Sequence, residues 1–244
     1  MSGPSRPPAE FDQYVEGYDH ALRRGISVSG ESREFFARGR IECLARRLRE
    51  QGEKPRLVIE YGCGTGFSVP LLRNILGAEF VIGLDVSNAS LEVAQEQQDR
   101  TRSLFITPDS YTPNEEADLV VSNGVFHHIE AGDRAAAVDF IYRSLRPGGL
   151  FCLWENNPWN PGTRYVMSRI PFDRDASPLP AVEARRILRN GRLEVLRTDH
   201  LFLFPRFLRW LRPLERLASG LPLGAQYQVL SRKPSRSGGA ENSR

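Results

Sequence analysis

The chain has 244 residues, a length that suits one domain with a sizeable buried core. Its 33 basic and 30 acidic residues leave a net charge of +3, which is too balanced to argue for a nucleic-acid partner. Three cysteines without C-x-x-C spacing (Cys43, Cys63 and Cys152) predict neither a disulfide framework nor a zinc site. No apolar run is long enough to span a bilayer and the first residues lack a signal-peptide core, so we expect a cytoplasmic location.

The N-terminal part of the chain has a helical pattern between two polar tails. Residues 1–9 and 233–244 are rich in Pro, Ser, Gly and charged residues, and we expect both tails to be disordered. Within residues 10–54, apolar side chains from Phe35 to Leu48 recur at spacings that place them on one helical face. This segment is therefore expected to form a helical cap on the domain.

Strand and helix patterns alternate in the middle of the chain. The predicted strands cover residues 57–60, 80–84, 104–107, 117–122 and 150–155, and the predicted helices cover residues 68–76, 133–145 and a segment starting near residue 88. This alternation predicts a parallel sheet with helices on both faces. Farther on, residues 156–180 contain five prolines and resemble a lid, and a helix near 181–190 and a closing strand near 225–231 follow.

A glycine-rich turn follows the first predicted strand. Glu60 ends the strand, and Gly62, Gly64 and Gly66 come directly after it. Glycines at such a turn let the backbone bend sharply and let a ligand approach closely. The next predicted strand ends in Asp85, an acid at the place where a ribose would be bound. Together these features predict a nucleoside-binding Rossmann-like unit.

The spacing of these residues distinguishes between nucleosides. Dinucleotide-binding turns have the pattern G-x-G-x-x-G, whereas this turn reads G-x-G-x-G after a carboxylate. Glu60 would repel a pyrophosphate but attract a cation such as a sulfonium or an ammonium. At this point the chain resembles the class I S-adenosylmethionine-dependent methyltransferases, whose first motif is E/D-x-G-x-G-x-G. The segment Leu145–Gly149 likewise resembles the L-x-P-G-G turn of that family, in which a glycine closes a helix.

The resemblance covers about residues 10–232 and implies a fold, a domain organisation and a cofactor. The implied fold is α/β and Rossmann-like, with a doubly wound, mainly parallel sheet of seven strands whose last strand is inserted antiparallel. The implied single domain has a helical cap (10–54), a core that binds S-adenosyl-L-methionine (56–155) and an acceptor-side lid with the late strands (156–222).

The resemblance also implies which residues contact the cofactor. Asp85 would bind the ribose hydroxyls, although it could instead cap the next helix. Asp109 would accept a hydrogen bond from the adenine amino group, although it could be a plain turn residue. Asn123 would line the cofactor. Tyr14 and Tyr18 lie four residues apart on one helical face, where Tyr14 could cover the sulfonium and Tyr18 the acceptor, or both could simply pack.

Two adjacent histidines are the candidate catalytic residues. His127 and His128 follow the strand that ends in Asn123, and histidine is well suited to remove a proton near neutral pH. We expect His127 to face the acceptor and His128 to be structural, with the alternative that both are structural. Adjacent histidines converge poorly on a metal, so no metal site is predicted.

Residues after the fifth predicted strand are candidates for acceptor binding. Glu155 or Asn156 could bind a hydroxyl or an amine, and Trp159 could stack on a ring. The alternative is a loop held by its own hydrogen bonds.

Basic and apolar residues alternate in segment 206–216. The pattern is typical of an amphipathic helix that touches a membrane surface or a lipid-like acceptor, or of a helix that packs its apolar face on the domain. The sequence does not predict an oligomeric state.

The most specific function that these motifs support is transfer of a methyl group from S-adenosylmethionine to an oxygen or nitrogen of a small-molecule acceptor. The alternatives are a non-catalytic S-adenosylmethionine-binding protein and an NAD(P)-dependent oxidoreductase.

Overall fold

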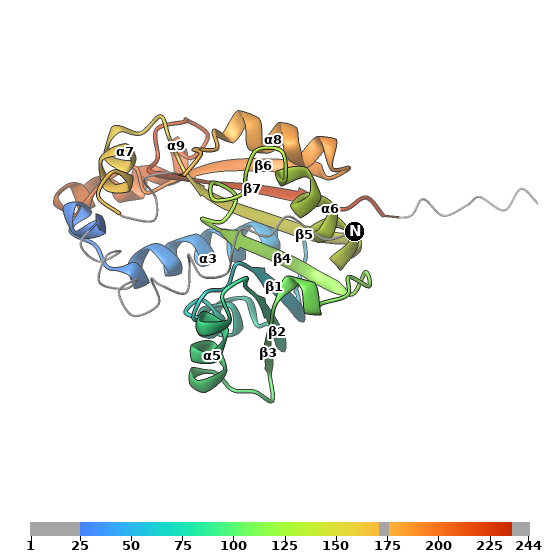
Figure 1. Ribbon diagram of the computed structural model, residues 1–244. Helices are drawn as coiled ribbons and strands as arrows, with labels where there is room; N and C mark the ends of the chain where they lie inside the picture. Colours follow the sequence, from blue (N-terminus) through green and yellow to red (C-terminus); the bar gives the residue numbers. More distant parts are fainter. Residues whose placement is uncertain (1–24, 171–175, 236–244) are drawn as a thin grey trace, which may run out of the picture.

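A seven-stranded sheet forms the centre of the computed structural model, which describes residues 25–170 and 176–235 (Figure 1). The strand order is β3-β2-β1-β4-β5-β7-β6. The strands are β1 (Leu57–Tyr61), β2 (Phe80–Leu84), β3 (Ser103–Ile106), β4 (Ala117–Asn123), β5 (Leu145–Asn156), β6 (Glu194–Leu201) and β7 (Gln226–Arg232). Strand β7 pairs antiparallel with both β5 and β6, while the pairs among β1 to β5 are parallel. The predicted mainly parallel, seven-stranded Rossmann-like sheet with an antiparallel last strand is confirmed.

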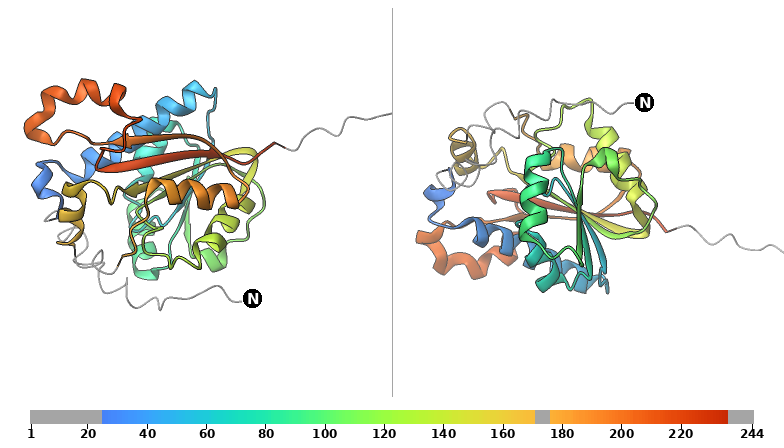
Figure 2. Two further views of the ribbon diagram at one scale, coloured as in Figure 1. Left: turned by 90° about the horizontal axis from the view of Figure 1, so that it is seen from above. Right: turned by 60° about the horizontal axis from the view of Figure 1, so that its bottom comes forward.

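Helices cover both faces of this sheet (Figure 2). One face carries α3 (Arg33–Glu50), α4 (Val69–Leu71) with its π-helical continuation η2 (Leu72–Leu76), and α5 (Asn88–Gln97). The other face carries α6 (Arg134–Ser144) and α8 (Ala181–Asn190). The remaining described elements are η1 (Ser27–Ser29), η3 (Pro108–Ser110), α7 (Pro161–Met167), η5 (Arg206–Leu214) and α9 (Glu215–Ala218).

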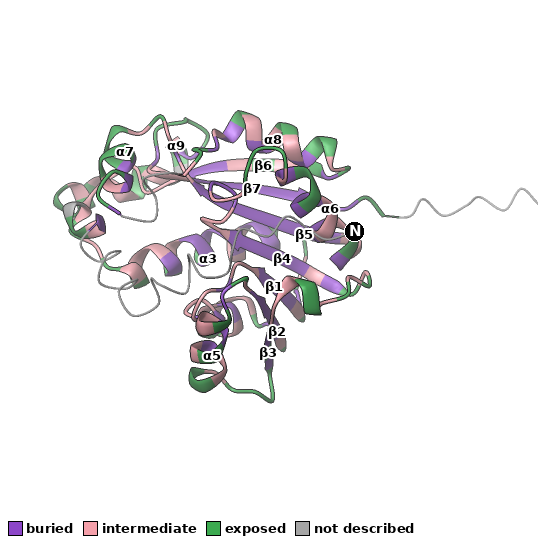
Figure 3. Ribbon diagram, in the orientation of Figure 1, coloured by how far each residue is buried: buried purple, intermediate pink, exposed green. Residues whose placement is uncertain are grey.

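Successive strand residues point into two separate cores. Val58 packs with the α3 side chains and Ile59 packs with the α6 side chains, because neighbouring residues of a strand face opposite sides of a sheet. A strand that is buried on both faces is apolar at almost every position, as the runs at 57–59 and 119–121 are. Figure 3 shows the buried strands between helices whose outer turns are exposed.

The described part of the predicted cap holds η1 and helix α3. Helix α3 begins after Ser32, whose hydroxyl accepts a hydrogen bond from the amide of Phe35 at 3.1 Å. Its buried side chains follow the predicted apolar face, and they include Arg47, whose Nε donates to Asp199 of β6 at 2.8 Å. The first 24 residues lie outside the described part of the chain.

The expected glycine closure of the helix before β5 is wrong, and the expected start of the C-terminal tail at residue 233 is too early. No glycine closes α6, because Leu145 is already extended and begins β5 with an irregular pairing to β4. Instead, the Lys233 ammonium donates to the carbonyls of Tyr142 and Leu145 at 2.9 and 2.7 Å, which satisfies acceptors at the helix end. Lys233 is therefore buried in the domain rather than part of a disordered tail.

None of the helices in residues 25–170 and 176–235 combines the length and the apolar composition needed to cross a bilayer.

Candidate active site

The carboxylate of Glu60 is buried at the carboxyl end of β1. Only 4% of the residue is exposed, and Oε2 has no hydrogen-bond partner in the part of the chain that the structure describes. Burial raises the pKa of Glu60 to about 7, against the opposing effects of the Ser68 hydroxyl and of Arg40 and Arg33. A buried, unsatisfied carboxylate oxygen at this position can receive a cationic ligand group.

The glycine turn lies directly after Glu60. Gly62 has a φ of 81°, and a Cβ there would lie 2.1 Å from Cγ2 of Val125, so no side chain fits. Gly64 has a φ of 51°, and a Cβ there would meet no atom within 4 Å, so this side of the turn is open. The turn thus packs against the loop after β4 on one side and leaves room for a ligand on the other.

Asp85 holds the glycine turn in place. Its Oδ2 accepts a hydrogen bond from the amide of Gly64 at 2.7 Å, and its Oδ1 accepts one from the amide of Ser87 at 3.0 Å. The cap of α5 is Ser87, whose hydroxyl accepts from the amide of Ser90, so Asp85 is not the helix cap. Ribose binding by Asp85 stays a prediction.

The other predicted cofactor residues occupy different environments. Asn123 ends β4 and lines the cavity described below. Asp109 is exposed on η3, beyond the end of β3 and outside that cavity. The predicted contacts of Tyr14 and Tyr18 lie outside the described residues.

A buried histidine–carboxylate pair joins the loop after β4 to the end of β5. Nδ1 of His127 lies 2.6 Å from Oε2 of Glu155, while Oε1 of Glu155 accepts from the amide of Phe126 at 2.8 Å. The two residues are 4% and 2% exposed. Because an ionised carboxylate only accepts hydrogen bonds, this contact assigns the proton of a neutral imidazole to Nδ1 and leaves Nε2 as the basic nitrogen.

Glu155 lines the cavity described below, and its predicted role in binding the acceptor stays a prediction. Both of its oxygens are engaged by the His127 loop, so it orients the histidine. His128 also lines the cavity, with its ring centroid 4.1 Å from that of His127.

Arg134, which no sequence motif marked, holds the loop that carries His127 in place. Its Nε donates to the carbonyls of Phe126 and Ile129 at 3.0 and 3.1 Å, and its Nη2 donates to the carbonyl of Ser177 at 2.9 Å. The amide of Ser177 in turn donates to the carbonyl of His127 at 2.9 Å. The position of His127 is therefore set by several buried hydrogen bonds.

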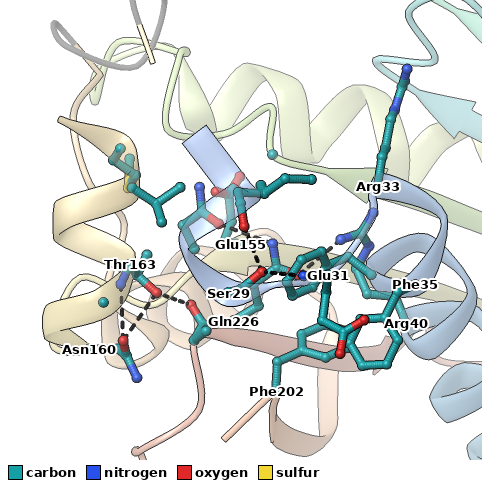
Figure 4. A pocket seen from close by; sticks show the side chains of 18 of the residues that line it. Ser29, Glu31, Arg33, Phe35, Arg40, Glu155, Asn160, Thr163, Phe202 and Gln226 are labelled. Carbon is teal, nitrogen blue, oxygen red and sulfur yellow. Dashed lines mark hydrogen bonds between the residues drawn. The ribbon is translucent and has the colours of Figure 1, made fainter. Parts of the chain in front are cut away.

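A cavity of about 400 Å³ opens beside His127 (Figure 4). Its walls come from η1 and α3, the ends of β4 and β5, α7, and the segment between β6 and η5. Phe35, Phe36 and Phe202 form an aromatic cluster on one wall, with ring centroids 4.9 to 5.8 Å apart. Charged side chains also reach it, among them Arg33, Arg40, and Arg212 in an ion pair with Glu31.

The remaining predicted acceptor residues are divided between the cavity and the surface. Asn156 lines the cavity and its Oδ1 accepts from Nε2 of Gln226 at 3.2 Å. Trp159 is 56% exposed and lies outside the cavity lining, so the geometry does not support its predicted role. Among the described residues, no group of three or more His, Cys, Asp or Glu side chains could hold a metal ion.

Comparisons with known proteins bear on this site. Residues 59–153, which hold the glycine turn, Asp85 and the His127 loop, match the family described as "Methyltransferase domain". The core of this chain is a class I S-adenosylmethionine-dependent methyltransferase domain.

Relatives of this methyltransferase domain cover different shares of the chain. Trans-aconitate 2-methyltransferase of Methylobacterium radiotolerans is 34% identical over 101 residues, which are 41% of this chain and 38% of that protein. A Mycolicibacterium smegmatis protein named "Probable S-adenosylmethionine-dependent methyltransferase" is 29% identical over 75% of this chain and 72% of its own length. The chain thus spans well under two thirds of the trans-aconitate relative that it matches.

Solved structures show that the fold extends beyond the matched core. A chain from the complex between the Haloferax volcanii Trm112 methyltransferase activator and a methyltransferase has a TM-score of 0.64 at 19% identity. It covers 92% of this chain and 98% of its own length, so the late strands belong to the shared fold.

S-adenosylmethionine, the cofactor of this family, fits the residues present. The unsatisfied Oε2 of Glu60 suits its ammonium group, and the open side of Gly64 leaves space against the turn.

Proposed function

We propose that the protein transfers a methyl group from S-adenosylmethionine to an oxygen or nitrogen of a small-molecule acceptor, with His127 as the general base. When bound, S-adenosylmethionine supplies an electrophilic methyl group on a sulfonium. The observation that carries the proposal is the buried His127–Glu155 pair at the border between the cofactor residues and the 400 Å³ cavity.

His127 would take the proton of the acceptor. Its Nδ1 is held by Glu155, so Nε2 is the nitrogen that can accept a proton from a hydroxyl or an amine. Proton uptake forms an imidazolium, which the adjacent carboxylate of Glu155 stabilises. Glu60 and Asn123 would hold the cofactor at the strand ends, so that the acceptor in the cavity meets it in a fixed orientation.

The size and lining of the cavity support a small acceptor. Its volume is in the range of small-molecule sites, and its wall combines an aromatic cluster with a few polar groups. The Methylobacterium relative is named for a small molecule, which supports the same class of acceptor over the part that matches. Oxygen and nitrogen are favoured over carbon because the pocket offers a base for a hydroxyl or an amine proton.

The test is a transfer assay with a labelled methyl donor and a panel of phenols, carboxylic acids and amines that includes trans-aconitate. We expect label in an acceptor of the panel, and we expect His127→Ala to lower kcat by about 10²- to 10⁴-fold with little change in cofactor affinity. Glu155→Gln should lower kcat in the same direction, because the amide no longer stabilises the imidazolium.

His128→Ala is the matched control, because it changes the neighbouring ring of the same cavity and should preserve most of the rate. Transfer by His127→Ala at the parental rate would refute the general-base role. Cofactor binding without transfer to any acceptor would favour the non-catalytic alternative.

A further inference from the structure

The segment that follows β6 exposes a row of large apolar side chains. Phe207, Trp210, Leu214 and Leu217 recur every three or four residues along η5 and α9, a segment that has a kink at Leu208 and a proline at position 213. Their exposed fractions are 76%, 72%, 50% and 86%. We call these four residues the apolar row.

Other side chains of the same segment are partly buried. Leu208, Leu211 and Ala218 are less exposed than the apolar row, and Glu215 is fixed by accepting from the amide of Phe204 at 2.8 Å. A surface helix in water normally turns a polar side outward. This segment instead exposes four large apolar side chains, and an exposed apolar surface marks an interaction site.

Positive charge accompanies the apolar row. Arg206 and Arg209 are exposed beside Phe207 and Trp210, and Arg212 pairs with Glu31 at 2.7 Å. An aromatic and aliphatic row flanked by arginines is the composition of helices that lie in the headgroup region of a bilayer, where arginines meet anionic lipids. Tryptophan in particular favours that boundary.

The apolar row is continuous with the cavity beside His127. Phe207 belongs to both, since it lines the cavity together with Leu203, Phe204 and Pro205. The segment is also held to the part of the chain between η1 and α3, because Nη1 of Arg206 donates to the carbonyl of Gly30 at 3.1 Å. Figure 2 shows this segment beside the N-terminal end of α3, at the same end of the domain as η1.

We propose that the apolar row docks the protein on an anionic lipid bilayer, and that the acceptor is an amphiphile that enters the cavity past Phe207. The docking is inferred from the exposure of the apolar row and from the arginines beside it. The identity of the acceptor as an amphiphile rests in addition on the proposed function.

Co-sedimentation with vesicles tests the docking without cofactor or acceptor. We expect the protein to bind vesicles of phosphatidylcholine mixed with phosphatidylglycerol, to bind phosphatidylcholine alone more weakly, and to be released by salt. Trp210→Ser with Leu217→Ser should weaken binding to the mixed vesicles by about tenfold or more, because two large side chains no longer enter the interface. Arg209→Ser should weaken binding to the mixed vesicles and not to phosphatidylcholine.

Val182→Ser is the matched control, because Val182 is 55% exposed on α8 and lies outside the apolar row. It should bind as the parent protein does. Circular dichroism should show the same fold in all variants, since every substituted side chain is exposed.

Tryptophan emission gives a second, local readout. Trp154 is 3% exposed, so in a Trp159→Phe background the emission that responds to vesicles comes from Trp210. A blue shift on adding mixed vesicles is expected. Absence of binding to both kinds of vesicle, or unchanged binding by Trp210→Ser with Leu217→Ser, would overturn the docking.

Self-association would overturn it as well, if the protein elutes as a dimer that the same double variant returns to a monomer. Loss of vesicle binding leaves cofactor binding untouched, so failure of this inference is distinguishable from failure of the proposed function.

Discussion

At the scale of single residues, the buried carboxylate of Glu60 lowers the stability of the free protein but provides the charge that binds a cationic ligand. The strand end buries a carboxylate whose Oε2 has no partner among the described residues, and its pKa of about 7 reflects that burial. Such a group costs stability in the free protein and gains a counter-charge only when a cationic ligand arrives.

The raised pKa predicts that cofactor affinity depends on pH. Protonation removes the charge that receives the ammonium, so affinity for S-adenosylmethionine should fall as the pH is lowered through about 7. Calorimetric titrations between about pH 6 and 7.5, where the ligand ammonium stays mostly charged, measure this. Glu60→Gln should bind weakly with a flatter pH dependence, and an equally steep dependence in that variant would assign the titration to another group.

The same shift predicts that Glu60→Gln stabilises the free protein. The pKa of the carboxyl is near its ordinary value of 4.5 in the unfolded chain and about 7 in the folded chain, so the folded state holds the extra proton between these pH values. Stability should therefore fall as the pH rises from 4.5 to about 7 and stay lower above it. Urea unfolding at alkaline pH should show Glu60→Gln more stable by about 1–3 kcal/mol, with no gain at pH values where both forms are neutral. A destabilised variant at alkaline pH would contradict this account.

At the scale of elements, one side of the glycine turn packs against the protein and the other side is open. Gly62 abuts Val125 in the loop that carries His127, while Gly64 faces open space. The turn therefore couples the position of the cofactor residues to that of the candidate base.

Two matched substitutions separate these sides. Gly62→Ala should destabilise the fold and displace the His127 loop, because its Cβ overlaps Val125, and Val125→Ala in the same chain should recover part of the loss. Gly64→Ala should fold with a cost of about 1 kcal/mol for its positive φ, yet bind S-adenosylmethionine more weakly. Thermal unfolding and calorimetry measure the two effects, and normal affinity in Gly64→Ala would show that the open side does not face the cofactor.

At the scale of the whole molecule, a buried ion pair joins helix α3 to the edge strand β6 of the sheet. Arg47 of α3 donates to Asp199 of β6 at 2.8 Å, and Arg197 donates to the same carboxylate at 2.9 Å. Burial alone would raise the pKa of Asp199, but the hydrogen bonds from Arg47 and Arg197 outweigh it and lower the pKa below 3.8. The stabilisation is thus present at neutral pH and is lost only as the pH falls through this lowered value.

Arg47→Met should lower the free energy of unfolding by about 3–5 kcal/mol, because Asp199 stays buried with one partner fewer. Arg49→Met on the exposed side of the same helix is the matched control and should change stability little. Equal stability of the two variants in urea unfolding would show that the pair is not a structural link.

Sequence patterns predicted the sheet and the glycine turn because both follow from local rules. Buried parallel strands are apolar runs, and the turn after β1 needs glycines and a carboxylate in fixed order. The same rules did not predict the contact between Glu155 and His127, because a carboxylate after a strand can face a ligand or a neighbouring loop, and only the fold brings His127 within 2.6 Å of it. Lys233 was misplaced for a similar reason, since its partners lie far back in the chain.

Some missed residues carried a usable signal. Arg40 and Arg47 fall within the repeat of buried positions 37, 40, 41, 44, 47 and 48 on α3, so the helical period alone marks them as buried arginines in need of partners. Arg134 had no such signal, because its partners are backbone carbonyls of the 126–129 loop and of Ser177.

The central claim is that Glu60 and the glycine turn bind S-adenosylmethionine beside the His127 cavity. Calorimetric titration of the protein with S-adenosylmethionine, S-adenosylhomocysteine and NADH tests it most directly. The account predicts that both adenosyl ligands bind, that NADH does not, and that Glu60→Gln weakens binding while His127→Ala preserves it. Binding of NADH alone, or equal affinity of Glu60→Gln and the parent protein, would contradict it.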